Sequence, residues 1–253
     1  MSATLTGIIN GEAGNDMLDA GAATGPVTFN GDDGKDSIQG SAFDDSLDGG
    51  AGDDRIFGGA GNDTIHGNDT LDGEAGTDRV IETANASLTL YNNRLTGNGI
   101  DSLAHFEEAS LAGDSGNNIL DASVFTLGPV TLTGNAGNDT LLGTSAADVI
   151  DGGNGIDQLR QSSRFDQTLT NSQLIGNATD SLNSLETANL KSLSALGSTI
   201  DASIFTGHVT LTGGEGPDHL LASLSRNSVI SGRAGNDTID GGNGNDWLNL
   251  VEW

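Results

Sequence analysis

The chain of 253 residues lacks cysteine, contains 3 prolines, and is only 4% aromatic and 34% hydrophobic. Without cysteine the fold cannot depend on disulfide bonds or on thiolate-bound zinc. The hydrophobic fraction is low for an ordinary core in a chain of this length. No run of 18 apolar residues occurs, so we expect no transmembrane segment. These absences favour a fold with a thin apolar seam.

Basic residues are scarce, because 9 lysines and arginines stand against 36 acidic residues and leave a formal charge of −27. Phosphate recognition requires a basic face, so nucleic acid is excluded as an expected partner and direct docking on anionic lipid is disfavoured. Self-repulsion of this size opposes a compact state. We therefore expect the chain to be largely disordered unless cations are bound.

Short catalytic motifs are also missing from the sequence. There is no His-Glu-x-x-His motif of zinc proteases and no Gly-x-Ser-x-Gly motif of lipases. Glu107 with Asp101, and Glu186 with Asp180, are paired carboxylates of the kind that glycoside hydrolysis uses. Each pair occurs once in each copy of a long repeat, so we interpret the pairs as capping or hydrogen-bonding groups. We expect no enzymatic activity.

Glycine is abundant, with 39 residues, and many of them recur at intervals of nine. Residues 49–54 read Gly-Gly-Ala-Gly-Asp-Asp and return at residues 58–63 as Gly-Gly-Ala-Gly-Asn-Asp, with an isoleucine at place eight of each copy. Glycine lets the backbone adopt positive φ and turn its carbonyl oxygens inward. The aspartate at place six adds an anionic oxygen. Such ligands suit calcium, so the pattern predicts calcium loops joined by short strands.

These nonapeptides resemble the repeat-in-toxin (RTX) motif of secreted bacterial haemolysins, proteases, lipases and epimerases. The resemblance implies an all-β fold, a right-handed parallel β-roll or β-solenoid. In it two nonapeptides make one turn and calcium ions lie between like loops of adjacent turns. It also implies type I export from a Gram-negative bacterium and folding outside the cell, where calcium is high enough to fill weak loops. We therefore expect an extracellular protein, either free or associated with the cell surface.

The copies divide the chain into six stretches. Nonapeptide blocks occupy residues 31–81, 134–160 and 213–253, and residues 1–30 hold one isolated copy. Residues 82–133 and 161–212 are two copies of a 52-residue insert, related by a shift of 79 positions. We expect the six stretches to stack as one continuous solenoid of about 14 turns. One or two helical turns at residues 103–111 and 182–190 are the alternative to strands there.

The resemblance assigns calcium ligands to sixth-place carboxylates and to the carbonyl oxygens of first- and fourth-place glycines. The expected ligands are Asp16, Gly31, Asp36, Gly40, Asp45, Gly49, Gly52, Asp54, Gly58, Gly61, Asp63, Asp69, Gly73, Asp78, Gly134, Asp139, Asp148, Gly152, Asp157, Gly213, Asp218, Gly232, Asp237, Gly241 and Asp246. Loops two nonapeptides apart would share ions, as residues 31–36 would with residues 49–54. Two further groups are expected not to bind. Asp32, Asp33, Asp44 and Asp53 would be solvated loop charges, and Asp19, Asp48, Asp121, Asp201 and Asp240 would form turns.

Two classes of function remain open. The first is a module that folds and assists secretion when it binds calcium. The second is an adhesive or polysaccharide-binding solenoid, whose inserts would contact an extracellular polysaccharide or a cell-surface component. Aromatic residues on a strand face would favour the second class, and the single tyrosine, Tyr91, gives it little support. The chain ends four residues after its last repeat, so we expect either a piece of a larger exoprotein or an unusually short secretion tail.

Overall fold

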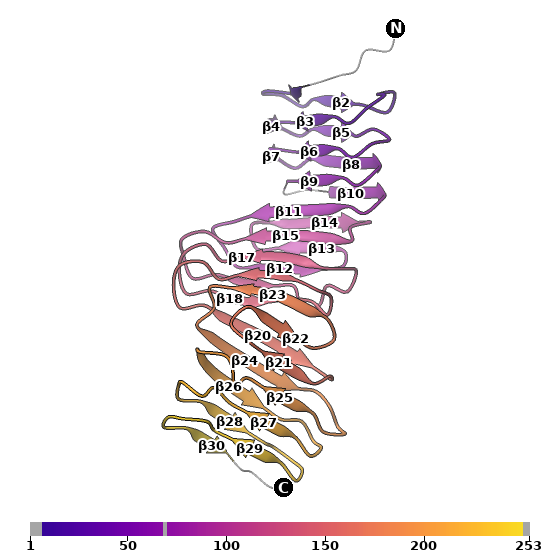
Figure 1. Cartoon of the computed structure of the whole chain (residues 1–253). Coiled ribbons are helices and arrows are strands. Elements are labelled where there is room, and N and C mark those ends of the chain that lie inside the picture. Colours follow the sequence, from indigo (N-terminus) through magenta and orange to yellow (C-terminus); the bar gives the residue numbers. More distant parts are fainter. Residues whose placement is uncertain (1–6, 68–69, 250–253) are drawn as a thin grey trace.

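The computed structural model describes residues 7–67 and 70–249. These residues form two sheets of 14 strands each and one two-stranded pair, and no helix occurs among them (Figure 1). No helical segment that could cross a membrane is therefore found in this part of the chain. The predicted all-β parallel β-roll is confirmed. The helical alternative for residues 103–111 and 182–190 is wrong, because inward and outward side chains alternate there with the period of a strand.

The first sheet, sheet 1, begins with the first strand of the chain. Its spatial order is β1 (Ile8–Asn10), β3 (Thr28–Asn30), β6 (Ser46–Asp48), β9 (Thr64–His66), β11 (Arg79–Thr83), β15 (Glu108–Ala112), β17 (Val130–Thr133), β19 (Val149–Asp151), β23 (Thr179–Asn183), β22 (Gln173–Ile175), β21 (Gln167–Leu169), β25 (Thr199–Asp201), β27 (His219–Leu221) and β29 (Thr238–Asp240).

The second sheet, sheet 2, lies opposite the first. Its spatial order is β2 (Met17–Asp19), β5 (Ser37–Gln39), β8 (Arg55–Ala60), β10 (Thr70–Ala75), β14 (Ile100–Ala104), β13 (Arg94–Thr96), β12 (Leu88–Tyr91), β16 (Ile119–Asp121), β18 (Thr140–Leu142), β20 (Gln158–Ser163), β24 (Thr187–Ser192), β26 (His208–Thr212), β28 (Val229–Ser231) and β30 (Trp247–Asn249). The small pair consists of β4 (Asp33–Gly34) and β7 (Ala51–Gly52).

Within the nonapeptide blocks, successive strands alternate between the two sheets. Ser37 lies opposite Arg55 in sheet 2, and Ser46 lies opposite Thr64 in sheet 1, so equivalent positions on adjacent turns are 18 residues apart. The aliphatic residue at place eight points between the sheets. Ile38, Leu47, Ile56 and Ile65 are at most 1% exposed. The core is thus one narrow file of side chains from each sheet, as the low hydrophobic content requires.

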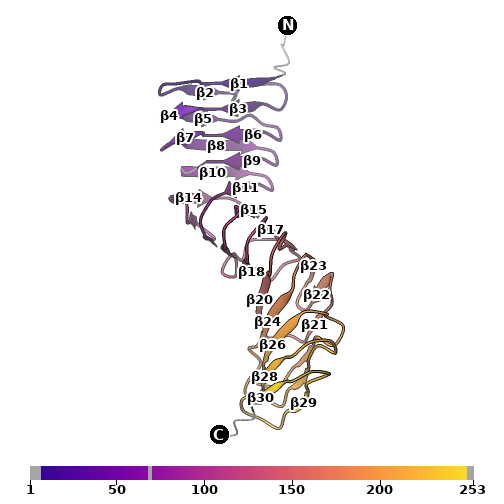
Figure 2. The same cartoon turned by 90° about the vertical axis from the view of Figure 1, so that its left-hand side faces the viewer.

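Each insert contains an antiparallel meander, which the sequence analysis did not predict. In the first insert β12, β13 and β14 are consecutive neighbours in sheet 2, and in the second β21, β22 and β23 are consecutive neighbours in sheet 1. Each meander adds two strands to one sheet only. Residues 7–67 and 70–249 therefore make 12 turns, where about 14 were expected for the chain. Figure 2 shows the stack slanting sideways through the region of the inserts and running straight on either side of it.

Phenylalanine fills turns of the inserts that carry no sixth-place carboxylate. Phe125 and Phe205 are 1% and 2% exposed and follow β16 and β25 in equivalent Asp-Ala-Ser-x-Phe turns. Their N–H groups donate to the Ala122 and Ala202 carbonyl oxygens at 2.9 and 3.1 Å. The inserts thus close their turns with apolar side chains, where the nonapeptide loops carry carboxylates.

Candidate metal centre

The sixth-place aspartates lie in two rows, each directly before the strands of one sheet. The row that enters sheet 2 contains Asp16, Asp36, Asp54, Asp139, Asp157 and Asp246. The row that enters sheet 1 contains Asp45, Asp63, Asp78, Asp148, Asp218 and Asp237. Asp69 lies outside the described residues. Stacking of the turns therefore places like loops next to one another, as the nine-residue period predicts.

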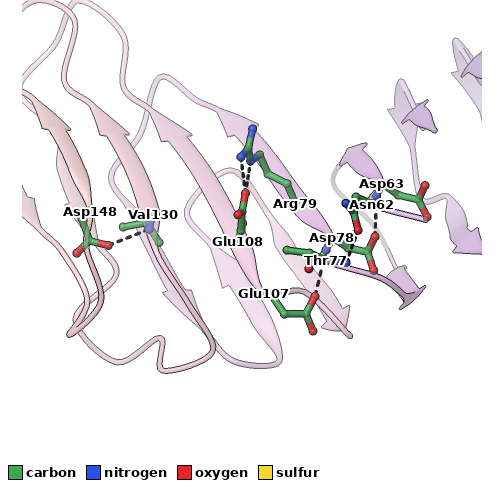
Figure 3. Close-up of polar contacts among 9 residues, drawn as sticks. All are labelled: Asn62, Asp63, Thr77, Asp78, Arg79, Glu107, Glu108, Val130 and Asp148. Atoms are coloured by element: carbon green, nitrogen blue, oxygen red, sulfur yellow. Dashed lines mark hydrogen bonds and ion pairs between the residues drawn. The ribbon is translucent and has the colours of Figure 1, made fainter. Parts of the chain in front are cut away.

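One oxygen of each of these carboxylates except that of Asp16 accepts an N–H of the neighbouring turn and holds that turn in register. The N–H of Asp36 donates to Asp54 Oδ1, and the N–H of Asp63 donates to Asp78 Oδ1, both at 2.7 Å. Figure 3 shows the second of these bonds together with its neighbours along the row. Because every bond joins two successive turns, the carboxylates are held in file along each edge of the roll.

The other oxygen, Oδ2, is buried without a hydrogen-bond partner at six of these aspartates: Asp16, Asp36, Asp63, Asp78, Asp139 and Asp157. Desolvation raises the pKa of Asp63 to about 6, although the bond from the Asp45 N–H opposes the shift. Burial likewise raises the pKa of Asp78, Asp139 and Asp157. Leaving such an oxygen buried and unpaired costs on the order of 1–3 kcal/mol. A bound cation would remove this cost.

Main-chain oxygens converge on the same points. A Cβ at Gly31, Gly58 or Gly134 would lie less than 3.0 Å both from the Oδ2 of its own loop and from the first-place carbonyl oxygen of the next turn. Two oxygens from adjacent turns therefore meet where only glycine leaves room. No three carboxylates or imidazoles of the described residues come together as a metal site, so carbonyl oxygens are needed to complete one. Carboxylate and carbonyl ligands of this kind fit calcium.

The fourth-place glycines have a packing role. Gly52 has φ of 150°, and a Cβ there would overlap the carbonyl oxygen of Gly34 on the turn before. Any other residue would push these two turns apart. The absence of a side chain at this place therefore sets how closely the loops stack.

The backbone conformation at the second place distinguishes two kinds of loop, which we call open and closed. In open loops its φ lies between 66° and 107°, as at Glu12, Asp32, Gly50, Gly59, Glu74, Asn135, Gly153, Arg233 and Gly242. Five of these nine residues are not glycine, and each pays roughly 1–2 kcal/mol of backbone strain. In several open loops the second-place N–H donates to the Asp or Asn that ends the preceding strand, as Gly50 does to Asp48. Strain that recurs at one place points to a function for that conformation.

Closed loops instead turn the second-place N–H toward the carboxylate. Ser41, Thr144 and Gly214 donate to Oδ2 of Asp45, Asp148 and Asp218 at 2.6 to 2.7 Å. The Ser41 and Thr144 hydroxyl groups add bonds of 3.0 Å to the same two carboxylates. These three aspartates therefore have protein partners for both oxygens, unlike the six with an unpaired Oδ2.

The rows of carboxylates end at the inserts with two glutamates. Neither was among the predicted ligands. Glu107 Oε2 accepts the N–H of Asp78 at 3.1 Å (Figure 3), and Glu186 Oε2 accepts the N–H of Asp157 at 2.9 Å. Both glutamates thus occupy the position of a sixth-place aspartate. The signal in the sequence was the repetition of Phe-Glu and Leu-Glu at the shift of 79 positions.

The residues before these glutamates complete the likeness to a loop. His105 and Ser184 have φ of 55° and 49°, and their carbonyl oxygens approach Gly73 and Gly152 as a first-place glycine carbonyl does elsewhere. Residues 105–107 and 184–186 are therefore three-residue versions of the six-residue loop. The hydrogen-bonding role predicted for the paired carboxylates is confirmed for Glu107, Glu186 and Asp180, since Asp180 Oδ1 likewise accepts the N–H of Asp148 at 3.0 Å.

The remaining aspartates brace the loops. As predicted, the five that follow strands form turns, accepting an N–H two residues on at 2.8 to 3.0 Å: Asp19, Asp48, Asp121, Asp201 and Asp240. Three of the four aspartates expected to be merely solvated do more. Asp32 accepts the N–H of Glu12, Asp44 accepts that of Asn62, and Asp53 forms an ion pair with Lys35, because fifth-place and second-place side chains also reach adjacent turns.

Comparison with protein families agrees with this geometry. The model of the RTX calcium-binding nonapeptide repeat, in four copies, matches residues 8–24, 30–65, 67–81, 131–159 and 212–248, just over half of the chain. The chain belongs to the RTX calcium-binding repeat family. The RTX segments contain all the sixth-place aspartates named above, whereas most of each insert lies outside them. No curated protein matches the chain.

Proposed function

We propose that this RTX β-roll binds several calcium ions between adjacent turns and becomes ordered as it binds them. One observation carries the proposal: buried Oδ2 atoms without partners converge with glycine carbonyl oxygens of the next turn. Metal ligation then supplies free energy to folding, because the unfolded chain has no preformed site. The net charge of −27 adds a repulsion that calcium would relieve.

The geometry favours particular loops as ligand sources. We assign calcium first to the six open loops whose Oδ2 is buried without a hydrogen-bond partner, with Asp16, Asp36, Asp63, Asp78, Asp139 and Asp157 as carboxylate ligands and the adjoining first-place glycines as carbonyl ligands. Glu107 and Glu186, with the carbonyl oxygens of His105 and Ser184, would complete the last site of two rows. The closed loops of Asp45, Asp148 and Asp218 would brace the stack and contribute least to ion binding.

A calcium titration of the chelated protein, followed by circular dichroism, tests this function. We expect a coil spectrum in EDTA, a cooperative change to a β spectrum with calcium, and little change with magnesium, which demands a smaller octahedral site. An unchanged β spectrum and unchanged melting temperature after exhaustive removal of calcium would contradict the proposal.

We further propose that the protein works outside the cell, as part of a secreted bacterial exoprotein exported by a type I system. Cytosolic calcium is too low to fill weak loops, so an acidic chain would stay unfolded and threadable before export, whereas extracellular calcium would saturate them. Export of the chain into the medium, compared with and without a type I exporter in the same cells, tests this.

A second candidate function, binding of an extracellular polysaccharide, is favoured by one surface feature. Basic side chains, which are rare in this chain, line a groove on sheet 2.

A further inference from the structure

Three of the nine basic residues line one groove of sheet 2 beside the second insert: Arg160 on β20, Lys191 on β24, and Arg233, which follows β28. No acidic residue lines this groove, although the chain has 36 of them. Among the ion pairs of the described residues, none involves these three side chains. The closest acid in strand register, Asp121, is two strands from Arg160 and accepts the Ser123 N–H and hydroxyl. The groove is therefore a cationic surface on an acidic molecule.

Neutral hydrogen-bonding groups accompany the cations. Arg160 lies opposite Asn189 in the sheet, and Lys191 lies between Ser162 and Thr212. The intervening residues Leu159, Leu190 and Leu211 are buried, so the polar side chains point outward by strand alternation. Charged, amide and hydroxyl groups thus repeat along the groove at the strand spacing of about 4.8 Å.

An apolar hollow adjoins the cationic groove and shares Gln161, Ser162 and Leu193 with it. Phe165 lies in this hollow with 57% of its surface exposed, and Leu193 is 47% exposed. A ligand that crosses both hollows would meet cations at one end and the aromatic face of Phe165 at the other, where Arg164 and the buried Asp180 also line the hollow. Such a ligand needs anionic groups, hydroxyl groups and an apolar face.

The first insert provides an internal comparison. At the shift of 79 positions, Arg160 corresponds to Ile81, Lys191 to Ala112 and Phe165 to Ala86. The strand register agrees, because Ile81 lies opposite Ser110 just as Arg160 lies opposite Asn189. Both copies form the same strands, so the basic and aromatic residues of the second copy are not required by the fold.

We propose that this groove binds an acidic polysaccharide, with Arg160, Lys191 and Arg233 pairing with the carboxylates of successive sugars. Ser162, Asn189 and Thr212 would bind sugar hydroxyl groups, and Phe165 would pack on the apolar face of a sugar ring. Nucleic acid fits less well, because its dense charge would be repelled by the acidic surface beyond the groove. This inference needs the folded roll but does not depend on which loops hold ions.

Titration of the full chain with an oligogalacturonate of defined length, in saturating calcium, tests the proposal. A neutral glucan of the same length and a single-stranded DNA oligonucleotide serve as comparison ligands. We expect the oligogalacturonate to bind at least about tenfold more tightly than either, and its binding to weaken as salt screens the ion pairs. Equal binding of the neutral glucan, or equal or tighter binding of DNA, would overturn the assignment to an acidic polysaccharide.

A matched pair of triple variants locates the site. Arg160→Ile, Lys191→Ala and Arg233→Ala together should weaken oligogalacturonate binding by about tenfold or more. Arg55→Ile, Arg94→Ala and Arg226→Ala remove the same charge elsewhere and should change it less than about twofold. Equal losses of oligogalacturonate affinity in both triple variants would show that the ligand binds through bridging calcium ions or through overall charge. This outcome would refute the groove as the binding site.

Circular dichroism in the same buffer separates binding from folding. If the triple variant fails to fold, Arg160→Ile alone, which introduces the residue of the equivalent position Ile81, replaces it with an expected loss of about threefold. A roll that stays ordered without calcium would refute the proposed function above and leave this binding test unaffected.

Discussion

The two oxygens of a sixth-place aspartate in an open loop have different tasks. Oδ1 accepts an N–H from the neighbouring turn, whereas Oδ2 is left buried beside a glycine carbonyl oxygen, as at Asp36. The closed loop of Asp45 differs because Ser41 donates to both of its oxygens. Residues of one type in one motif therefore have different chemistry, and the backbone of place two decides which.

Substitution by asparagine separates these two kinds of aspartate. Asp36→Asn keeps an oxygen acceptor for the Asp16 N–H but removes the charge, so we expect roughly tenfold weaker calcium binding at that loop. Asp45→Asn should change calcium affinity less than about twofold, because its second oxygen already has a protein partner. Isothermal titration with calcium measures both.

The control for this pair is Asp166→Asn. Asp166 is exposed in the second insert, outside the nonapeptide loops, and asparagine keeps an acceptor for the Thr199 N–H. The control removes one negative charge, as the two test variants do, and should leave calcium affinity unchanged. Equal effects at Asp36 and Asp45 would contradict the distinction between open and closed loops.

A second residue-scale prediction concerns pH. Burial raises the pKa of Glu82, although a bond of 3.2 Å from the Asn98 amide opposes the shift. A carboxylate whose pKa is higher in the folded state destabilises the fold once the pH rises above its unfolded value, near 4.5. Glu82→Gln, which introduces the residue found at the equivalent Gln161, should therefore stabilise the protein by about 1 kcal/mol at pH 7.

The gain should shrink as the pH falls toward 4.5 and disappear below it, where Glu82 is protonated in both states. Urea denaturation of both proteins at pH 7 and pH 5, in saturating calcium, measures it. Glu215→Gln, at an exposed position, should leave stability unchanged at both pH values. A gain that grows toward acid pH would mean that the sign is wrong.

At the scale of elements, the nonapeptide blocks could be predicted from the sequence because each place has one physical role. Place eight points inward as Ile38 and Leu47 do, and Asp48 forms the turn before the next loop. The distinction between open and closed loops was harder to predict. Gly214 is a glycine, as is common in open loops, yet its N–H donates to the carboxylate as in a closed loop. No Asp or Asn precedes the first glycine in the closed loops, as Gln39, Leu142 and Thr212 show, but Phe57, Thr133 and Ser231 precede open loops, so this residue does not decide the state.

The meanders were missed for a different reason. Asn92 and Asn93 separate β12 from β13, and a two-residue polar loop between strands indicates a hairpin. The periodicity of the neighbouring blocks instead favoured parallel coils throughout. Short strands of three to five residues carry too little pattern to decide their own direction, so the pairing of β13 with β14 depends on contacts that only the fold supplies.

The apolar turns of the inserts should respond to mutation differently from the calcium loops. Phe205→Ala should cost about 3–5 kcal/mol, because it empties a buried turn that no ion fills. Raising calcium beyond saturation should not restore this loss, as measured by urea denaturation. Phe165→Ala, at a side chain that is 57% exposed, should change stability by less than about 0.5 kcal/mol. Recovery of the Phe205 variant with calcium would contradict the apolar role of this turn.

At the scale of the whole molecule, calcium removal should change size as well as secondary structure. Sheets of 14 strands at a spacing of about 4.8 Å give a rod roughly 60 Å long, with a radius of gyration of about 20 Å. An unfolded chain of this length has a radius of gyration of about 55 Å. Small-angle scattering should therefore show a large expansion in EDTA that reverses when calcium returns. A radius that stays near the rod value would contradict the coupling of binding to compaction.

The spacer between the inserts controls the path of the rod. Residues 134–160 contain three nonapeptides, an odd number of half-turns, so the second meander enters the sheet opposite the first. Each meander adds two strands to one sheet and should therefore tilt the stack away from that sheet. Meanders in opposite sheets should compensate each other's tilt. One added nonapeptide should bring both meanders to one side and produce a hooked particle in scattering, while two should restore the original outline. Whether the number of nonapeptides between the inserts is odd or even thus sets the direction of the C-terminal part of the rod, although no single residue determines it.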